Sequence, residues 1–215
     1  MSARKVGAAV ALVAGLGVSG AAQATLIPRA AGMVYDDVLE ITWAPADLFG
    51  PASPGWDEAV AWADSLVYGG FSDWRLASMS VAGGLPSGAT DSVVDCSAGT
   101  EEACRDNELG YMFYWNLGGT PGADLSGDQG PFTGIRGFYW SGTAYASDPI
   151  DVWAFGFRDG NQSTYSTASV GDDNKNPWAV RTGDVLAAPE PGSLLLLGAG
   201  LAGLGVSRRA VRRRG

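Results

Sequence analysis

Over Gly55–Ser78, apolar and polar residues recur at the spacing of an amphipathic helix, and we expect the domain to pack around this stretch. The apolar stripe is formed by Trp56, Val60, Ala63 and Val67, with Ala59 and Leu66 beside it. Asp57 and Glu58 fall in the first turn, where the helix dipole favours negative charge. Gly69-Gly70 is predicted to end the helix through a left-handed cap, before a short strand at Asp73–Leu76.

A second, shorter helix is predicted over Asn107–Leu117, closed by Gly118-Gly119. Three aromatic residues are expected to thicken its apolar face: Tyr111, Tyr114 and Trp115. Short apolar runs predict strands at Met33–Tyr35, Leu39–Trp43, Phe138–Ser141, Val152–Phe157, Gln162–Ser166 and Pro177–Arg181. Asp159-Gly160 is a predicted hairpin turn, and the glycine-rich stretch Met79–Asp106 is predicted to be a loop.

Residues 1–24 are typical of a secretory signal. A basic start precedes an apolar run at Val6–Val18, which is too short for a good membrane span. Ala22-Gln23-Ala24 fits the small-residue cleavage pattern, so we expect cleavage between Ala24 and Thr25. The alternative is an anchor helix that stays uncleaved.

The other end of the chain, residues 187–215, has the features of a sorting tail. Pro189-Glu190-Pro191 precedes an apolar run at residues 192–206, a predicted transmembrane segment, and arginines cluster after it. A helix of this length spans about 22 Å, less than the hydrocarbon core of about 30 Å unless flanking residues snorkel. Because positive residues stay on the cytoplasmic side, the body, residues 25–186, is expected outside the inner membrane.

The charge is unevenly distributed. All 23 acidic residues lie between Thr25 and Pro191, where only seven basic residues lie, so this part carries a formal charge of −16. Such an acidic body repels nucleic acid and anionic membrane surfaces, which leaves cations, neutral glycans or basic surfaces as partners.

The chain contains no histidine, which excludes Ser-His-Asp and Cys-His catalysis and histidine metal sites. Its two cysteines, Cys96 and Cys104, are close in sequence. In an exported chain they are expected to form a small disulfide loop, because a cysteine-only metal site would need four thiolates.

The order of Pro189-Glu190-Pro191, an apolar segment and an arginine cluster resembles the PEP-CTERM sorting signal of Gram-negative bacteria. The resemblance implies processing by exosortase, a membrane transpeptidase-like protease, and a transient stay of the tail in the inner membrane. It also implies an association with exopolysaccharide and biofilm matrix. A plain C-terminal anchor helix with a basic stop-transfer segment is the alternative.

Five motifs occur in order between Met33 and Val185: Trp56–Ala59, Gly69–Leu76, Tyr139–Thr143, Trp153–Gly160 and Trp178–Arg181. Together they resemble the C-terminal domain of the Lcl collagen-like adhesins, although Ala77 stands where that family usually has proline. A more distant similarity to C-type-lectin-like and formylglycine-enzyme-like domains implies an α+β fold with two short helices, a twisted antiparallel sheet and long loops. The adhesins bind sulfated glycosaminoglycans, a function that the acidic body here does not favour.

Several side chains are candidates for ligand contact. Six tryptophans suit either a sugar-stacking platform or the core, namely Trp56, Trp62, Trp74, Trp140, Trp153 and Trp178. The core is the simpler interpretation, except for Trp62, which lies off the apolar stripe. Arg75 and Arg181 form either a carboxylate-binding pair or structural salt bridges with Asp73 or another carboxylate.

Two oxygen-rich loops are weak candidates for calcium. Asp124, Ser126 and Asp128 alternate before Gly130, which partly matches a calcium loop without its closing glutamate. Asp172-Asp173 begins a second such loop. Ordinary solvated loops are the alternative. With only oxygen ligands on offer, calcium fits better than zinc, and no other cofactor is predicted.

These features predict a non-enzymatic, exported protein of the cell envelope or exopolysaccharide matrix that is processed by exosortase. Its expected partner is extracellular polysaccharide or another surface protein, and its role is adhesive. The first alternative is a calcium-dependent, lectin-like glycan-binding module. The second is a glycan hydrolase that uses paired carboxylates.

Overall fold

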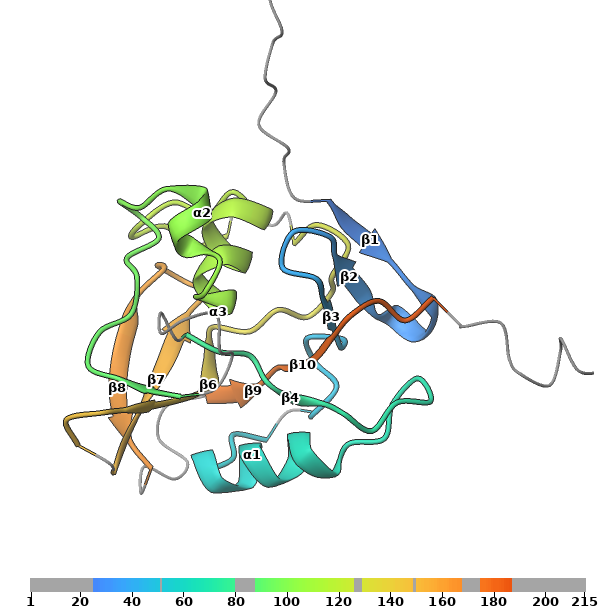
Figure 1. Ribbon diagram of the computed structural model, residues 1–215, viewed down its shortest axis with the longest axis horizontal. Coiled ribbons are helices and arrows are strands. Elements are labelled where there is room, and N and C mark those ends of the chain that lie inside the picture. The colour runs from blue at the N-terminus through green and yellow to red at the C-terminus, as the bar shows by residue number, and fades with distance from the viewer. Residues whose placement is uncertain are drawn as a thin grey trace, which may run out of the picture.

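Two sheets frame the molecule in a computed structural model that describes residues 25–50, 52–79, 88–125, 129–148, 150–167 and 175–186 (Figure 1). The first sheet is antiparallel, in the order β1-β2-β3-β10-β4. Its strands are β1 (Leu26–Pro28), β2 (Val34–Asp36), β3 (Ile41–Trp43), β4 (Arg75–Leu76) and β10 (Ala179–Thr182). The η1 turn, Ala30–Gly32, joins β1 to β2.

The second sheet has the order β5-β6-β7-β8, and β9 also pairs with β6. Its strands are β5 (Ala89–Thr90), β6 (Phe138–Tyr145), β7 (Asp151–Gly156), β8 (Gln162–Ser166) and β9 (Lys175–Pro177). The β5–β6 and β6–β9 pairs are parallel. The expectation of one antiparallel sheet is therefore wrong, because β6 takes its partners on one side from distant parts of the chain.

One continuous segment, β9 to β10, links the two sheets. β9 pairs with β6, and β10 then inserts between β3 and β4, so that Val180 lies opposite both Trp43 and Arg75. Trp178, at the junction, is fully buried, and its indole N–H donates to the Ala44 carbonyl oxygen over 2.8 Å. This segment holds the two halves of the molecule together.

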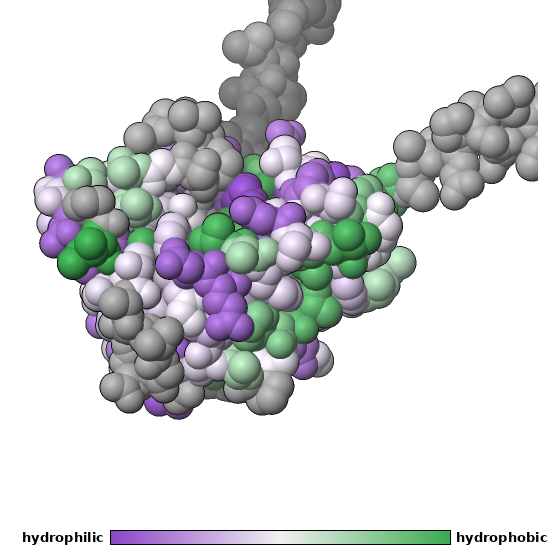
Figure 2. All heavy atoms as spheres, turned by 90° about the horizontal axis from the view of Figure 1, so that it is seen from below, coloured by the Kyte–Doolittle hydropathy of each residue, from purple (hydrophilic) through white to green (hydrophobic). Residues whose placement is uncertain are grey.

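The first helix, α1, spans Trp56–Ser65 and lies below both sheets in Figure 1. Ala59 and Ala63 are fully buried against a cluster that includes Trp140. Its outward side is polar, and Figure 2, which views the molecule from below, shows hydrophilic and hydrophobic residues interspersed on this face. The helix thus covers the sheets through small side chains on one side only.

The predicted end of α1 is wrong. The helix stops at Ser65, because Leu66 adopts an extended conformation and packs on a cluster that includes Trp74, which leaves Val67 73% exposed. Gly69-Gly70 instead forms a tight turn in which both residues have positive φ angles, 61° and 89°. These conformations favour glycine, as the sequence indicated, but in a turn rather than in a helix cap.

The second helix is confirmed, in two parts. A short α-helix, α3 (Glu108–Tyr111), continues as a π-helix, η2 (Met112–Asn116). The Asn107 side chain caps the start by accepting a hydrogen bond from the Gly110 N–H, and Gly118 follows with a φ of 66°. Trp115 does not thicken the apolar face; it is 36% exposed, because the helix buries its other side. A further short helix, α2 (Glu101–Cys104), lies within the predicted loop.

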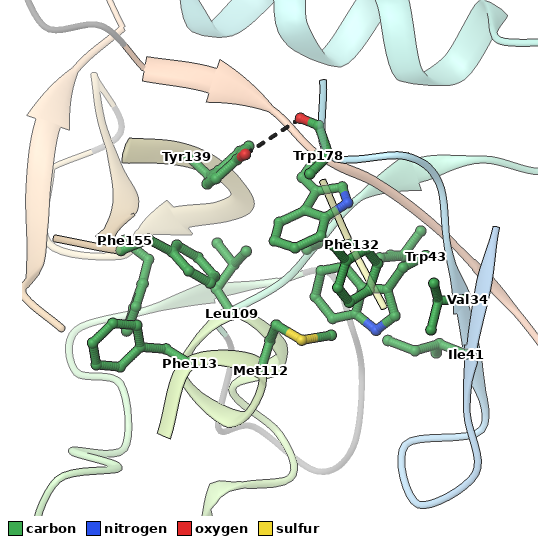
Figure 3. Close-up of a cluster of buried hydrophobic side chains, with 14 of the residues drawn as sticks. Val34, Ile41, Trp43, Leu109, Met112, Phe113, Phe132, Tyr139, Phe155 and Trp178 are labelled. Carbon is green, nitrogen blue, oxygen red and sulfur yellow. Dashed lines mark hydrogen bonds between the residues drawn. The ribbon is translucent and has the colours of Figure 1, made fainter. Parts of the chain in front are cut away.

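The main core fills the space between the two sheets and the second helix (Figure 3). Trp178 is at its centre, with its ring 4.8 Å from that of Trp43 and 5.0 Å from that of Tyr139, measured between ring centroids. Phe113 of η2 packs on Phe155 of β7 at 5.5 Å. Aromatic packing thus joins every part of the fold, since large rings contribute most of the apolar area that a small core buries.

The fold is a mixed α+β architecture with a few short helices and two curled sheets, as the sequence predicted at this level. Among the residues described, no helix is long and apolar enough to cross a membrane. The predicted signal helix and the predicted transmembrane segment both lie outside those residues.

Candidate functional site

Arg75 and Arg181 do not form a shared site. Arg75 lies opposite Val180 in the sheet, and Arg181 is the next residue along β10, so the two side chains project from opposite faces. Arg75 binds Glu108 through two hydrogen bonds, Nη1 to Oε2 at 2.8 Å and Nη2 to Oε1 at 2.6 Å. Glu108 Oε2 also accepts the Ser78 N–H at 2.7 Å.

Arg181 binds a different carboxylate. Its Nε and Nη2 atoms lie 2.8 and 3.0 Å from the two carboxylate oxygens of Asp73. These hydrogen bonds, together with the positive charge, lower the pKa of the Asp73 carboxyl below its ordinary value, although partial burial opposes this. Each arginine is therefore committed to its own structural salt bridge.

Trp62 is half-buried rather than free. It projects from α1 between two hydrophobic clusters, and the Phe49 ring meets it edge-on at 5.3 Å between centroids. Four other tryptophans are buried: Trp43, Trp74, Trp140 and Trp178. Trp56 and Trp153 are half-buried, and each donates its indole N–H to a backbone carbonyl. The tryptophans thus serve packing, and they form no exposed platform in the part of the chain that is described.

Of the predicted calcium ligands, the structure describes only Asp124. Asp124 is exposed. The remaining four candidates lie outside the described residues: Ser126, Asp128, Asp172 and Asp173. Within the described ranges there is no group of three acidic or cysteine side chains placed to hold a metal. Calcium binding stays a prediction.

The predicted processing sites lie largely outside the described ranges. This holds for Ala24 and for the Pro189-Glu190-Pro191 triplet. Thr25, on the other side of the predicted cleavage point, is described, and its backbone N–H donates to Asp37 Oδ1 at 2.7 Å.

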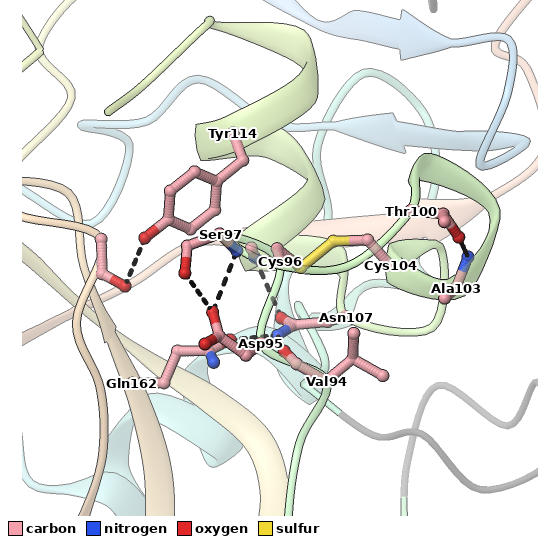
Figure 4. Close-up of a disulfide and its surroundings, with 12 residues drawn as sticks. Val94, Asp95, Cys96, Ser97, Thr100, Ala103, Cys104, Asn107, Tyr114 and Gln162 are labelled. Atoms are coloured by element: carbon pink, nitrogen blue, oxygen red, sulfur yellow. Dashed lines mark hydrogen bonds between the residues drawn. A yellow bond between two sulfur atoms is a disulfide. The ribbon is translucent and has the colours of Figure 1, made fainter. Parts of the chain in front are cut away.

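Cys96 and Cys104 lie at disulfide-bonding distance, with their Cα atoms 5.4 Å apart (Figure 4). The pair packs against the start of α3, so closely that a Cβ atom on Gly110 would come within 2.7 Å of the Cys96 sulfur. Asn107, the cap of α3, also donates to the Val94 carbonyl oxygen at 3.1 Å. The cysteine loop therefore supports the helix that carries Glu108; the bond itself remains to be tested.

Sequence analysis missed a surface pocket of about 280 Å³. It lies between the loop that precedes β6 and the residues that follow β7. Its lining includes Asp124, Gln129, Arg136, Gly137, Phe157 and Arg158. The pocket is thus polar at its rim and has a buried aromatic residue, Phe157, in its wall.

Five of the seven basic side chains of the body are engaged elsewhere. Arg29 pairs with Asp184 at 2.6 Å, and Arg105 pairs with Glu101 at 3.4 Å. Lys175 lies over the Tyr165 ring, with its Nζ atom 3.7 Å from the centroid. Arg75 and Arg181 form the two salt bridges described above.

The two remaining basic side chains, Arg136 and Arg158, both line the pocket. Neither side chain has an ion pair or a hydrogen bond within the part of the chain that the structure describes. In a body with so many carboxylates, two unpaired guanidinium groups in one pocket are exceptional. They are donors available to an anion.

Backbone hydrogen bonds hold the main chain at Arg136 and at Phe157, the residue before Arg158. The Arg136 N–H donates to the Tyr139 hydroxyl oxygen at 2.8 Å, and that hydroxyl donates to the Ala46 carbonyl oxygen at 3.3 Å. Burial raises the pKa of Tyr139 well above its ordinary value, so the hydroxyl stays protonated. Arg158 follows Phe157, whose N–H donates to the Gly137 carbonyl oxygen at 2.7 Å.

The loop that carries Arg136 is also held from within. Gln129 accepts the Ile135 N–H on its side-chain oxygen at 2.9 Å and the Phe132 N–H on its backbone oxygen at 3.1 Å. Gly137 leaves room for the Arg158 side chain, since a Cβ atom there would come within 2.9 Å of Arg158 Nε. The pocket wall is therefore built by specific contacts rather than by a loose loop.

The strand register explains why the two arginines meet. Phe138 of β6 lies opposite Gly156 of β7. Continuing this antiparallel register two residues further places Arg136 opposite Arg158. Each arginine lies two residues from one member of the Phe138–Gly156 pair, but this relation has meaning only once the pairing of β6 with β7 is known.

Comparison with known proteins adds one finding. The chain carries the sorting signal of an exported protein: residues 187–214 match the PEP-CTERM protein-sorting motif. The motif indicates an extracellular protein of a Gram-negative bacterium that is sorted by exosortase through a membrane-anchored tail. Neither a curated protein nor a solved structure matches the chain.

Proposed function

We propose that the body is a non-enzymatic, adhesive protein of the outer surface or the extracellular matrix. Its partner is extracellular polysaccharide or another surface protein. The observation that carries this proposal is the PEP-CTERM motif at residues 187–214, because it places the body outside the cell. The membrane tail serves sorting, and the body does the binding.

The body itself supports a binding role rather than a chemical one. The chain has no histidine, and its two cysteines lie at disulfide-bonding distance from each other. The two unpaired arginines of the pocket offer hydrogen-bond donors to a ligand. The five motifs between Met33 and Val185 resemble the Lcl C-terminal domain and, more distantly, C-type-lectin-like domains, a fold relationship that we include in the proposal.

A binding assay tests the adhesive role. The protein secreted by its host is immobilised and exposed to the host's own exopolysaccharide, and retention is measured by surface plasmon resonance. We expect retention without release of reducing sugars. Release of soluble sugar products would overturn the non-enzymatic role, and absence of retention on both polysaccharide and intact cells would overturn adhesion.

The same assay tests the calcium-dependent alternative. Its one described ligand is Asp124, an exposed residue at the pocket. Retention that is lost in chelator and restored by calcium would favour that alternative, together with a rise in thermal stability when calcium is added. Retention that is unchanged in chelator favours the calcium-independent role.

Fractionation of host cells tests the location. We expect the body on the outer surface or in the matrix, and mass spectrometry of the mature protein should show the chain ending near Pro189-Glu190-Pro191. An intact arginine cluster on a protein retained in the inner membrane would contradict this.

A further inference from the structure

We propose that the Arg136–Arg158 pocket binds one monoanionic group, the carboxylate of an acidic sugar residue in the extracellular polysaccharide. This inference rests on the proposed function, because it names the ligand class of that binding role. It is carried by the two arginines that line one pocket and have no carboxylate partner among the residues the structure describes.

The charge of the pocket selects a single negative charge. Among the described residues that line the pocket, Arg136 and Arg158 contribute two positive charges and Asp124 one negative charge, a balance of +1. The surrounding body carries an excess of negative charge and repels anions beyond the pocket. A chain with a dense run of sulfates or phosphates is disfavoured, whereas one carboxylate that enters the pocket meets its own counter-charge.

The size of the pocket points to one sugar residue. Its volume of about 280 Å³ is just below the range of about 300–1,000 Å³ that is typical of sites for drug-sized ligands. The lining is mainly polar: Gln129 adds polar atoms to those of the two arginines, and Phe157 in the wall is buried. A longer oligosaccharide would extend out of the pocket across the surface.

Arginine suits a carboxylate because its planar guanidinium group donates two parallel hydrogen bonds to the two oxygens. The backbone contacts of Arg136 and Phe157 fix the main chain from which both arginine side chains extend before the ligand arrives. Such preorganisation reduces the ordering that binding requires. The carboxylate of a uronic acid and a sulfate ester are both monoanions, so the experiment includes both.

The test uses the secreted protein and measures binding of D-glucuronate, D-glucose and D-glucose 6-sulfate by isothermal titration calorimetry. We expect D-glucuronate to bind, and D-glucose to bind at least about tenfold more weakly, since hydrogen bonds to charged groups are the stronger ones. Equal binding of glucuronate and glucose would overturn the inference. Preferential binding of the sulfate would overturn the assignment to a carboxylate.

Variants locate the binding. Arg136→Ala and Arg158→Ala are each expected to weaken glucuronate binding at least about tenfold. The matched control is Arg105→Ala, which removes an exposed arginine far along the chain and should leave binding unchanged. Near-UV circular dichroism establishes that each variant is folded. A further variant, Arg158→Lys, keeps the positive charge but lacks the planar guanidinium group, so it should also weaken binding. Unchanged binding in both folded alanine variants would overturn the proposal.

Two further variants separate geometry from charge. Gly137→Ala keeps both arginines but forces Arg158 to move, because the added Cβ would lie 2.9 Å from its Nε atom; binding should weaken several-fold. Asp124→Asn removes the one negative charge among the described residues that line the pocket, so binding should become several-fold tighter. Tighter binding in Gly137→Ala would contradict the pocket geometry, and weaker binding in Asp124→Asn would contradict the charge balance.

The assay with native polysaccharide distinguishes this inference from the proposed function. If the Arg136→Ala/Arg158→Ala protein still binds polysaccharide as the wild type does, the pocket assignment fails while the adhesive role stands. If the wild type binds glucuronate but no polysaccharide or cell surface, the pocket stands and the adhesive role fails.

Discussion

The Arg75–Glu108 salt bridge and the Arg136–Arg158 pocket use the same side-chain type in opposite ways. Arg75 and Glu108 are 22% and 7% exposed, and their two hydrogen bonds join β4 to the second helix. Arg136 and Arg158 have no such partner within the described residues. In a strongly acidic body, an arginine without a described carboxylate partner is the exception. Arg75 therefore stabilises the fold, whereas Arg136 and Arg158 are available to a ligand.

The largest expected change in stability comes from breaking the Arg75–Glu108 salt bridge. Glu108→Gln removes the negative charge but keeps the size of the side chain, and it leaves the Arg75 charge without compensation. Removing one partner of a buried pair should lower the free energy of unfolding by about 3 kcal/mol. Urea unfolding measures this, and Glu102→Gln on the exposed side of α2 is the control. A loss equal to that of the control would show that the pair is not structural.

The next largest effect concerns the Cys96–Cys104 loop, which packs against the helix that carries Glu108. If Cys96 and Cys104 form the predicted disulfide, replacing both with serine should lower the free energy of unfolding by about 2.5 kcal/mol, from the entropy of so short a loop. Non-reducing mass spectrometry of the secreted protein checks that the bond exists. Two free thiols would contradict the prediction, whatever the stability of the variant.

Asp73 gives a smaller effect, which depends on pH. Its side chain is 57% exposed, so Asp73→Asn should lower stability by only about 0.5 kcal/mol at neutral pH. Because Arg181 lowers the pKa of the folded carboxyl, this stabilisation is present above the ordinary pKa of aspartate, about 4, and is lost as the pH falls through the lower folded value. The stabilities of the wild type and the variant, measured by urea unfolding, should therefore converge in acid.

The pocket arginines should have the smallest effect on stability. Arg136→Ala and Arg158→Ala each remove a charge that has no described partner, so the free energy of unfolding should change by less than about 0.5 kcal/mol. Urea unfolding of both variants checks this. A loss comparable to that of Glu108→Gln would remove the distinction between structural and available arginines.

Much of the secondary structure could be predicted, because helices and strands leave local patterns of apolar and turn residues in the sequence. Gln162–Ser166 forms a strand with the predicted bounds, and the second helix begins within one residue of its predicted start at Asn107. The end of α1 could not be predicted, because Leu66 leaves the helix to reach a cluster built from three other segments. The parallel pairing of β9 with β6 was also hidden, since no local pattern records a partner so far away in the chain.

The site shows the same limit. Sequence analysis named Asp73 as a possible salt-bridge partner, and Arg181 binds it, but nothing in the sequence indicated that Glu108 lies beside Arg75. The pocket depends on which cations are left over after pairing. That information exists only when all partners are known in three dimensions.

The position of β10 in the chain has a consequence for secretion. This strand lies inside the first sheet, between β3 and β4, yet it ends only a few residues before the sorting motif begins at residue 187. The sheet cannot assemble until Ala179–Thr182 have left the export channel, because β3 and β4 have no other strand between them. The strand that completes the first sheet is therefore among the last parts of the body to follow the chain out, directly ahead of the sorting tail.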